Sequence, residues 1–211
     1  MAQYCLRTTQ EPHCRAWLPL WEEAALVWSY YDLDQLAADD GLLYPELSLQ
    51  GLGVRFYRSP LGVDRRFYPG FLKGEPRYRL LATGFVADSE CLKECSQAVA
   101  IAGGRMFHVG HELHLGAHVT RGLHLTDDEM RLRYSSSDFV AGLRRIEGFE
   151  MPAAEGLVCG ARPILFDRPH YRAWYDGLAV FIPEGDAEAV TESLVAVLRD
   201  GPRPVTAEER R

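Results

Sequence analysis

The sequence of 211 residues has no apolar run near the roughly 20 residues that a membrane-spanning helix needs. Its N-terminus also lacks the pattern of a signal peptide, so we expect a cytoplasmic protein with no membrane span. An excess of positive charge is missing too, since the formal net charge is −7. Loose binding to nucleic acid or to anionic membranes needs clustered cations and is therefore disfavoured, although a local basic groove is compatible with this charge.

Cysteines are few, and the sequence has no Cys-x-x-Cys pair among its five. An odd number of cysteines in an intracellular chain predicts reduced thiols. Cys91 and Cys95 are four residues apart on a predicted helix, and Cys159 precedes a glycine. We expect these three side chains to pack in the core and not to react.

A metal site is not predicted, although five histidines fall within 17 residues, at positions 108, 111, 114, 118 and 124. His111 and His114 would converge only on a helix, and Gly110 and Gly116 indicate a loop. We expect His108 or His111 to lie at a strand end near a ligand. Asp32 and Asp34 match the Asp-x-Asp pattern of an acidic metal-binding motif, but this pair is more typical of a helix cap followed by a surface acid.

Strands and helices alternate after residue 76, which predicts a parallel, doubly wound sheet with ligands at the carboxyl ends of its strands. The predicted strands are 79–83, 105–109, 139–143, 163–166 and 180–182. The predicted helices are 89–102, 127–134, 153–159 and 187–198. Thr126 and Glu129 form a capping box, and Gly160 is placed to end a helix.

Two regions are predicted, with a boundary in the Pro- and Gly-rich stretch of residues 60–76. Residues 1–65 form a reduced N-terminal α/β region with strands at 3–7, 26–31 and 53–57 and helical stretches at 20–25 and 32–38. Residues 66–211 form the larger, Rossmann-like domain. A second capping box, Thr206 with Glu209, opens close to the last residue. It suggests either part of a longer chain or an unusually compact enzyme.

The most informative stretch runs from Glu147 to Glu155, two carboxylates on either side of a glycine-containing turn and Pro152. Proline is tolerated in the first turn of a helix, so we expect a helix start here, with Glu155 in its first turn. The amides around Phe149–Met151 would then lie at the positive end of the helix dipole. Such a helix terminus binds phosphate, and a carboxylate beside it accepts hydrogen bonds from sugar hydroxyls. The pattern favours a nucleotide-sugar ligand.

The run EGFEMPAAEGLVCGARPI resembles the Glu–seven residues–Glu signature of retaining glycosyltransferases of family 4, usually seen as EGFGLPxLEAxxxGxPVI. Four further segments are similar to family motifs and follow in the family's order: SPLGVDRRFYP, YRLLATG, FHVG and GLHLTDDEMRLRYSSSDFVAGL. The resemblance covers residues 59 to 200. As a whole, the sequence most resembles short members of the family of the bacteriophage type. This resemblance implies a GT-B-like fold, with Rossmann-like parallel sheets, helices on both faces and a much reduced N-terminal domain.

The resemblance also implies roles for single residues. Glu155 would accept hydrogen bonds from the donor ribose, and Glu147 would face the donor sugar or its leaving phosphate. Glu150 stands where the family has a small or apolar residue, and we expect it to be solvated. The donor-binding set implied by the resemblance is Gly84, Gly110, Gly148, Phe149, Glu150, Met151 and Glu155.

One departure from the family concerns the positive charge that stabilises the departing diphosphate. The family has an arginine after the first-strand glycine, and here Phe85 follows Gly84. Lys93 and Arg145 are the candidates to supply this charge, with Arg144 as a neighbouring alternative.

Taken together, these residues predict a retaining glycosyltransferase that uses a nucleoside-diphosphate sugar as donor substrate and needs no cofactor. The acceptor would be a hydroxyl of a glycan or of a hydroxylated base in phage DNA, in the host cytoplasm if the protein is viral. The alternative is a donor-binding remnant, or a partner subunit of a glycosyltransferase, without turnover. Neither the donor base nor the oligomeric state is predicted.

Two groups of aromatic residues have two possible roles each. We expect packing in the core for His170, Tyr171, Trp174 and Tyr175, with the lining of an acceptor cleft as the alternative. The run from Trp28 to Tyr31 is expected to be a buried strand, with a sugar-stacking platform as the alternative.

Overall fold

The computed structural model describes residues 26–29, 56–71, 74, 76–85, 90–111, 114–144 and 149–211. The chain clusters into two compact units. One comprises Met1–Gly62, Ile146–Phe149 and Arg168–Trp174, and the other comprises Val63–Arg145, Glu150–Asp167 and Tyr175–Arg211. In the first unit, β1 (Val27–Ser29) pairs in parallel with β2 (Phe56–Arg58). The predicted segments at 3–7, 20–25 and 32–38 lie outside the described residues.

The second unit is built on a sheet of six strands in the order β5-β4-β3-β6-β7-β8. Every neighbouring pair is parallel, as the alternation of strands and helices predicted. The strands are β3 (Tyr78–Thr83), β4 (Met106–Val109), β5 (Val119–Gly122), β6 (Ser137–Gly142), β7 (Arg162–Phe166) and β8 (Val180–Ile182). The predicted Rossmann-like α/β fold is confirmed.

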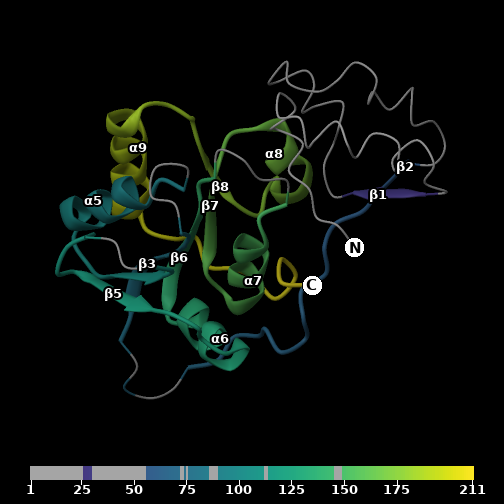
Figure 1. Ribbon diagram of the computed structural model, residues 1–211, viewed down its shortest axis with the longest axis horizontal. Coiled ribbons are helices and arrows are strands. Elements are labelled where there is room, and N and C mark those ends of the chain that lie inside the picture. The colour runs from purple at the N-terminus through teal and green to yellow at the C-terminus, as the bar shows by residue number, and fades with distance from the viewer. Residues whose placement is uncertain are drawn as a thin grey trace. The chain divides into compact units, whose positions relative to one another are not determined.

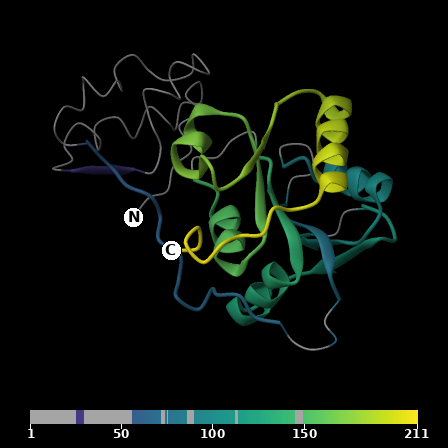
Figure 2. The same ribbon diagram turned by 180° about the vertical axis from the view of Figure 1, so that it is seen from behind.

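Helices cover both faces of this sheet (Figure 1 and, from behind, Figure 2). On one face α5 (Leu92–Ala102) packs along α9 (Ala187–Asp200), and on the other α6 (Asp127–Ser135) packs along α7 (Met151–Cys159). The contact side of α9 carries Val190, Leu194 and Leu198, one helical turn apart and fully buried. The short helix α8 (Pro169–Tyr175) follows β7.

Local sequence signals account for several helix ends. The capping box at α6 is present, because the Glu129 amide donates to the Thr126 hydroxyl and the Thr126 amide donates to the Glu129 carboxylate. Gly160 ends α7 with a left-handed φ of 97°. Gly156 lets α7 lie close to the sheet, because a Cβ there would stand 2.5 Å from Cγ1 of Val140.

One prediction about an element was wrong, and one strand was not predicted. The helix α7 begins at Met151, two residues before the predicted start, so Glu155 falls in its second turn and not in its first. The strand β5 was not predicted, because its sequence VTRG has neither an apolar run nor a clear alternation. It is one of the two edge strands of this sheet and, in the described part of the chain, pairs with β4.

The segment after α9 has no helix or strand and is held to the sheet by one buried cation. Arg162 of β7 is 2% exposed, and its guanidinium donates to the carbonyls of Leu178, Arg203 and Pro204. It also donates to both carboxylate oxygens of Glu209, at 3.0 and 3.2 Å. Glu209 in turn forms the predicted capping box with Thr206.

Candidate functional site

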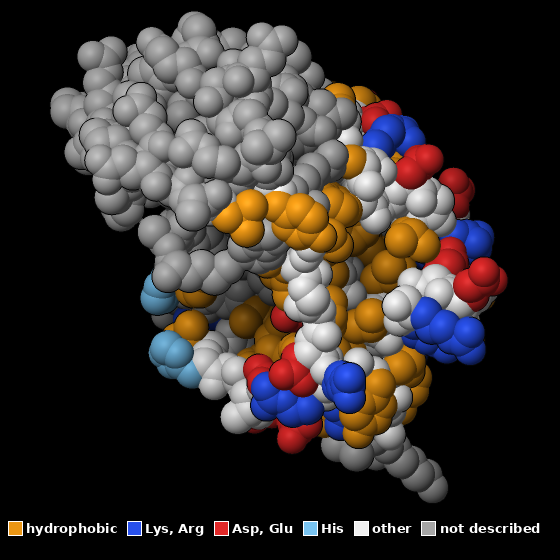
Figure 3. All heavy atoms as spheres, turned by 90° about the vertical axis from the view of Figure 1, so that its right-hand side faces the viewer, with side chains coloured by type: hydrophobic (Ala, Val, Ile, Leu, Met, Phe, Trp, Pro, Cys, Tyr) orange, Lys and Arg blue, Asp and Glu red, His pale blue; other side chains and the backbone are white. Residues whose placement is uncertain are grey.

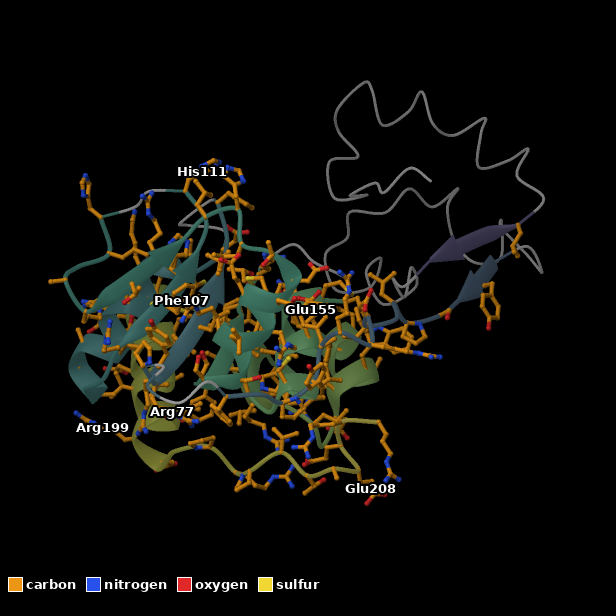
Figure 4. The ribbon with its side chains drawn as sticks, turned by 90° about the horizontal axis from the view of Figure 1, so that it is seen from below. Arg77, Phe107, His111, Glu155, Arg199 and Glu208 are labelled. Atoms are coloured by element: carbon orange, nitrogen blue, oxygen red, sulfur yellow. The ribbon has the colours of Figure 1, made fainter. Side chains whose placement is uncertain are left out.

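The strand order reverses between β3 and β6, and this is the point where doubly wound sheets bind ligands. From β3 the chain moves outward through β4 to β5, and it then returns to β6 on the other side of β3. The carboxyl ends of these two strands are Thr83 and Gly142. Figure 4 shows His111, which follows β4, on the side of the sheet opposite to Arg77, which precedes β3. His111 therefore lies at the carboxyl edge of the sheet, as do Thr83 and Gly142.

Arg144 joins the two strands at this edge. It follows β6, and its Nη2 lies 3.2 Å from the Thr83 hydroxyl and 3.5 Å from the Thr83 carbonyl at the end of β3. Its Nε lies 3.3 Å from Glu90 and its Nη1 lies 3.6 Å from Glu150. The guanidinium therefore stands between two carboxylates, and its side chain is 21% exposed.

Glu90 was not recognised in the sequence as a site residue. Its carboxylate accepts a hydrogen bond from the Phe85 amide at 2.6 Å, in addition to the Arg144 ion pair. A Cβ at Gly84 would stand 2.3 Å from a Glu90 oxygen. Gly84 was predicted to belong to the donor-binding set, and in this structure the space beside it holds the Glu90 carboxylate.

Glu150 was expected to be solvated, and this prediction was wrong because the residue is only 1% exposed. Its backbone is left-handed, with φ 64° and ψ 72°, a conformation that costs a residue with a side chain about 1–2 kcal/mol. The side chain passes over Gly142, where a Cβ would lie 2.5 Å from Cγ of Glu150. The Tyr175 hydroxyl donates to the Glu150 carbonyl at 3.0 Å and fixes the turn that begins α7.

Glu155 lies on α7 and faces α6. Its carboxylate accepts a hydrogen bond at 3.0 Å from the hydroxyl of Tyr134, a fully buried residue. Burial raises the pKa of the Glu155 carboxyl, and the Tyr134 hydrogen bond acts in the opposite direction. Glu155 is half-buried, so part of its carboxylate is accessible to a further hydrogen-bond donor.

The ends of β3 and β4 approach each other closely through Gly110. A Cβ there would stand 1.8 Å from the Gly84 carbonyl oxygen, so this position requires glycine for packing alone. His108 is buried, and its Nε2 lies 3.1 Å from the same carbonyl. Burial lowers the pKa of His108, so a neutral imidazole that donates through Nε2–H fits this contact. Beyond the strands, the rings of Phe85 and His111 pack edge to face at 4.9 Å.

The remaining predicted site residues lie either outside the described residues or at the starts of helices α5 and α7. Glu147, Gly148 and Arg145 lie outside the described residues, so their roles stay predictions. Lys93 is exposed in the first turn of α5, and Met151 is the first residue of α7. Phe149 is buried, with its ring edge-to-face against Trp174 at 5.8 Å.

Several smaller predictions concern packing. Cys91, Cys95 and Cys159 are buried free thiols, as expected for core positions. The buried residues His170, Tyr171 and Tyr175 belong to α8, in agreement with the expectation of packing. Strand β1 covers part of the predicted strand 26–31, whereas Tyr30, Tyr31 and the Asp32–Asp34 pair lie outside the described residues.

Within the described part of the chain, no three or more His, Cys, Asp or Glu side chains cluster as a metal site would require. His118 instead lies 2.9 Å from the carbonyl of Ser96. Helices long and apolar enough to cross a membrane are also absent from the described residues. On the face shown in Figure 3, the coloured acidic and basic side chains intermix and form no broad basic patch.

The fold is similar to that of solved glycosyltransferase structures. HepE from Anabaena, in complex with UDP and glucose, superposes with a TM-score of 0.68 at 12% identity, over 93% of this chain and 60% of that protein. Sucrose-phosphate synthase from Thermosynechococcus elongatus gives a TM-score of 0.67 at 16% identity, over 92% and 54%. The C-terminal domain of the group 1 glycosyltransferase LpcC from Francisella tularensis gives 0.52 at 15% identity, over 71% and 91%.

These similarities define the class of fold as that of the GT-B glycosyltransferases. The chain spans 54% and 60% of the length of the sucrose-phosphate synthase and of HepE. No protein-family model matches the sequence, and no curated protein matches it significantly.

Proposed function

We propose that the protein binds a nucleoside-diphosphate sugar at the carboxyl edge of β3 and β6 and transfers the sugar to a hydroxyl acceptor. The observation that carries the proposal is the meeting of Arg144, Glu150 and the start of α7 at the reversal point of the sheet. A second support is that HepE, which has a similar fold, is bound to UDP and glucose.

Each part of the donor has a candidate partner. A diphosphate needs amide donors and a cation, and the Met151 amide at the positive end of α7 and the Arg144 guanidinium are suited to these roles. The ribose hydroxyls need an acceptor, and Glu155 has a half-buried carboxylate that is held in place by Tyr134. As the sugar–phosphate bond breaks, negative charge grows on the departing diphosphate, and donors aimed at it lower the barrier.

The finer points rest on the resemblance to family 4. They are transfer with retention, Glu147 facing the donor sugar, and an acceptor that is either a glycan or a hydroxylated base in phage DNA, in the host cytoplasm if the protein is viral. The net charge of −7 favours the glycan over DNA, because DNA binding relies on clustered cations. Retention is tested by assigning the anomeric configuration of the product by NMR.

A second candidate function is donor binding without turnover. Phe85 stands where the family has an arginine, and the charge of Arg144 is balanced by Glu90 and Glu150. Both features would weaken leaving-group stabilisation.

One experiment separates the two functions. The protein is screened by thermal shift and calorimetry against UDP-, GDP-, ADP- and TDP-sugars, and the best donor is then followed for slow hydrolysis without acceptor. Binding with hydrolysis supports the transferase, and tight binding without hydrolysis supports the second candidate. If none of these nucleotide sugars binds, both proposals are wrong.

A further inference from the structure

Among the residues that the structure describes, the side chains of Arg144, Glu90 and Glu150 form a charged cluster at the reversal point of the sheet. Arg144 contacts Glu90 through Nε, Glu150 through Nη1 and Thr83 through Nη2. The three charged side chains are buried or nearly so, with exposed fractions of 21% for Arg144, 14% for Glu90 and 0% for Glu150. In such surroundings charges interact more strongly than in water, so the cluster strongly influences which ligand can bind.

The two carboxylates are held by the fold in similar ways. Each occupies space that a glycine leaves beside the end of a strand, Glu90 over Gly84 and Glu150 over Gly142. Glu150 in addition adopts a left-handed backbone and is fully enclosed, so it is a fixed partner of Arg144. Glu90 retains some exposure and precedes α5 in a turn, so it is the partner that a ligand can replace.

Among the described residues of this cluster, two carboxylates face the Arg144 guanidinium, and each of them repels an anionic ligand. Phosphate and carboxylate oxygens match the guanidinium fork in the same way, so one can replace the other on Arg144. A phosphate group at this edge would therefore have to displace Glu90 from Nε of Arg144.

We propose that Arg144 binds the phosphate at this site and that the Glu90 carboxylate competes with the phosphate for Nε of Arg144. The inference rests on the proposed function, and it assigns the positive charge to Arg144 in place of Lys93 and Arg145. The ligand class is a diphosphate, free or as part of a nucleotide.

The test uses calorimetry with inorganic pyrophosphate on four proteins: wild type, Glu90→Gln, Arg144→Met and the double variant. Removal of a like charge next to the phosphate should tighten pyrophosphate binding to Glu90→Gln by at least about fivefold. Arg144→Met should weaken binding at least about tenfold, because it removes a charged hydrogen bond. In the double variant the gain from Glu90→Gln should disappear.

Matched controls come from the far end of α9, where Arg199 and Asp200 are exposed. Arg199→Met and Asp200→Asn make the same charge changes and should leave pyrophosphate binding unaltered. Circular dichroism and melting curves verify that every variant is folded. If Arg144→Met does not fold, Arg144→Lys replaces it, because lysine keeps the charge but lacks the planar fork of the guanidinium. The tightening of pyrophosphate binding by Glu90→Gln should then be smaller in the Arg144→Lys protein than in wild type.

The inference is wrong if Glu90→Gln binds pyrophosphate no better than wild type, or if its gain survives in the double variant. This outcome is distinguishable from failure of the proposed function. Nucleotide sugars that bind normally to all variants leave the function standing and overturn the inference. Pyrophosphate bound through Arg144, together with no binding of any nucleotide sugar, supports the inference and overturns the function.

Discussion

Replacement of Glu155 is expected to weaken donor binding and to destabilise the fold by separable amounts. One carboxylate oxygen accepts from the Tyr134 hydroxyl, so the ribose would use the accessible remainder. Loss of a hydrogen bond to a charged group costs about 1.5–3 kcal/mol, which is roughly ten- to a hundredfold in donor affinity for Glu155→Ala. The same change leaves the buried Tyr134 hydroxyl without its acceptor, at a cost of about 1–3 kcal/mol in folding stability.

Tyr134→Phe separates the two effects. This variant loses the same internal hydrogen bond but keeps the carboxylate, so it should lower the melting temperature while reducing donor affinity much less than Glu155→Ala. The assay is calorimetry with the best nucleotide sugar, alongside thermal unfolding, with Glu188→Ala on the exposed first turn of α9 as control. An unchanged dissociation constant for folded Glu155→Ala would refute the ribose assignment. Equal losses in both variants would show that Glu155 acts only through Tyr134.

Three further outcomes are expected. Gly142→Ala should destabilise the protein by about 1–3 kcal/mol in denaturant unfolding, because the new Cβ would press on Glu150 and Leu165; an unchanged midpoint would contradict this. Because burial raises the pKa of Glu155 above its ordinary 4.5, the native state holds this proton more tightly than the unfolded state. The contribution of Glu155 to stability should therefore fall as pH rises from 4.5 through the raised pKa, and Glu155→Gln should remove this slope in unfolding measured across that range. EDTA should leave turnover largely unchanged, whereas loss of activity restored by manganese or magnesium would refute the metal-free prediction.

The fold was predictable because its signals are local. Strands such as 180–182 are short apolar runs between turn formers, and Thr126 with Glu129 marks a helix start by chemistry that involves only neighbouring residues. The start of α7 was misplaced because Pro152 is accepted at the first or second helical position, and the sequence alone does not choose between them.

The site was less predictable because its contacts are not local. Glu90 and Arg144 are 54 positions apart in the sequence, and the pairing of β3 with β6 brings them together. The burial of Glu150 involves its packing over Gly142 at the end of β6, which is also a non-local contact. A glutamate where the family has a small residue was the available signal, and the solvated interpretation overlooked that a left-handed backbone beside Gly142 could direct the side chain inward.

Arg162 has a practical consequence for protein engineering. Judged by helices and strands alone, a fragment that ends after α9 would retain every element of the sheet unit. Such a fragment would lack the carbonyls of Arg203 and Pro204 and the carboxylate of Glu209, which solvate the Arg162 guanidinium inside the protein. A buried charge stripped of its partners is strongly destabilising. Expression fragments and limited-proteolysis maps should therefore treat residues 203–209 as an integral part of the folded unit.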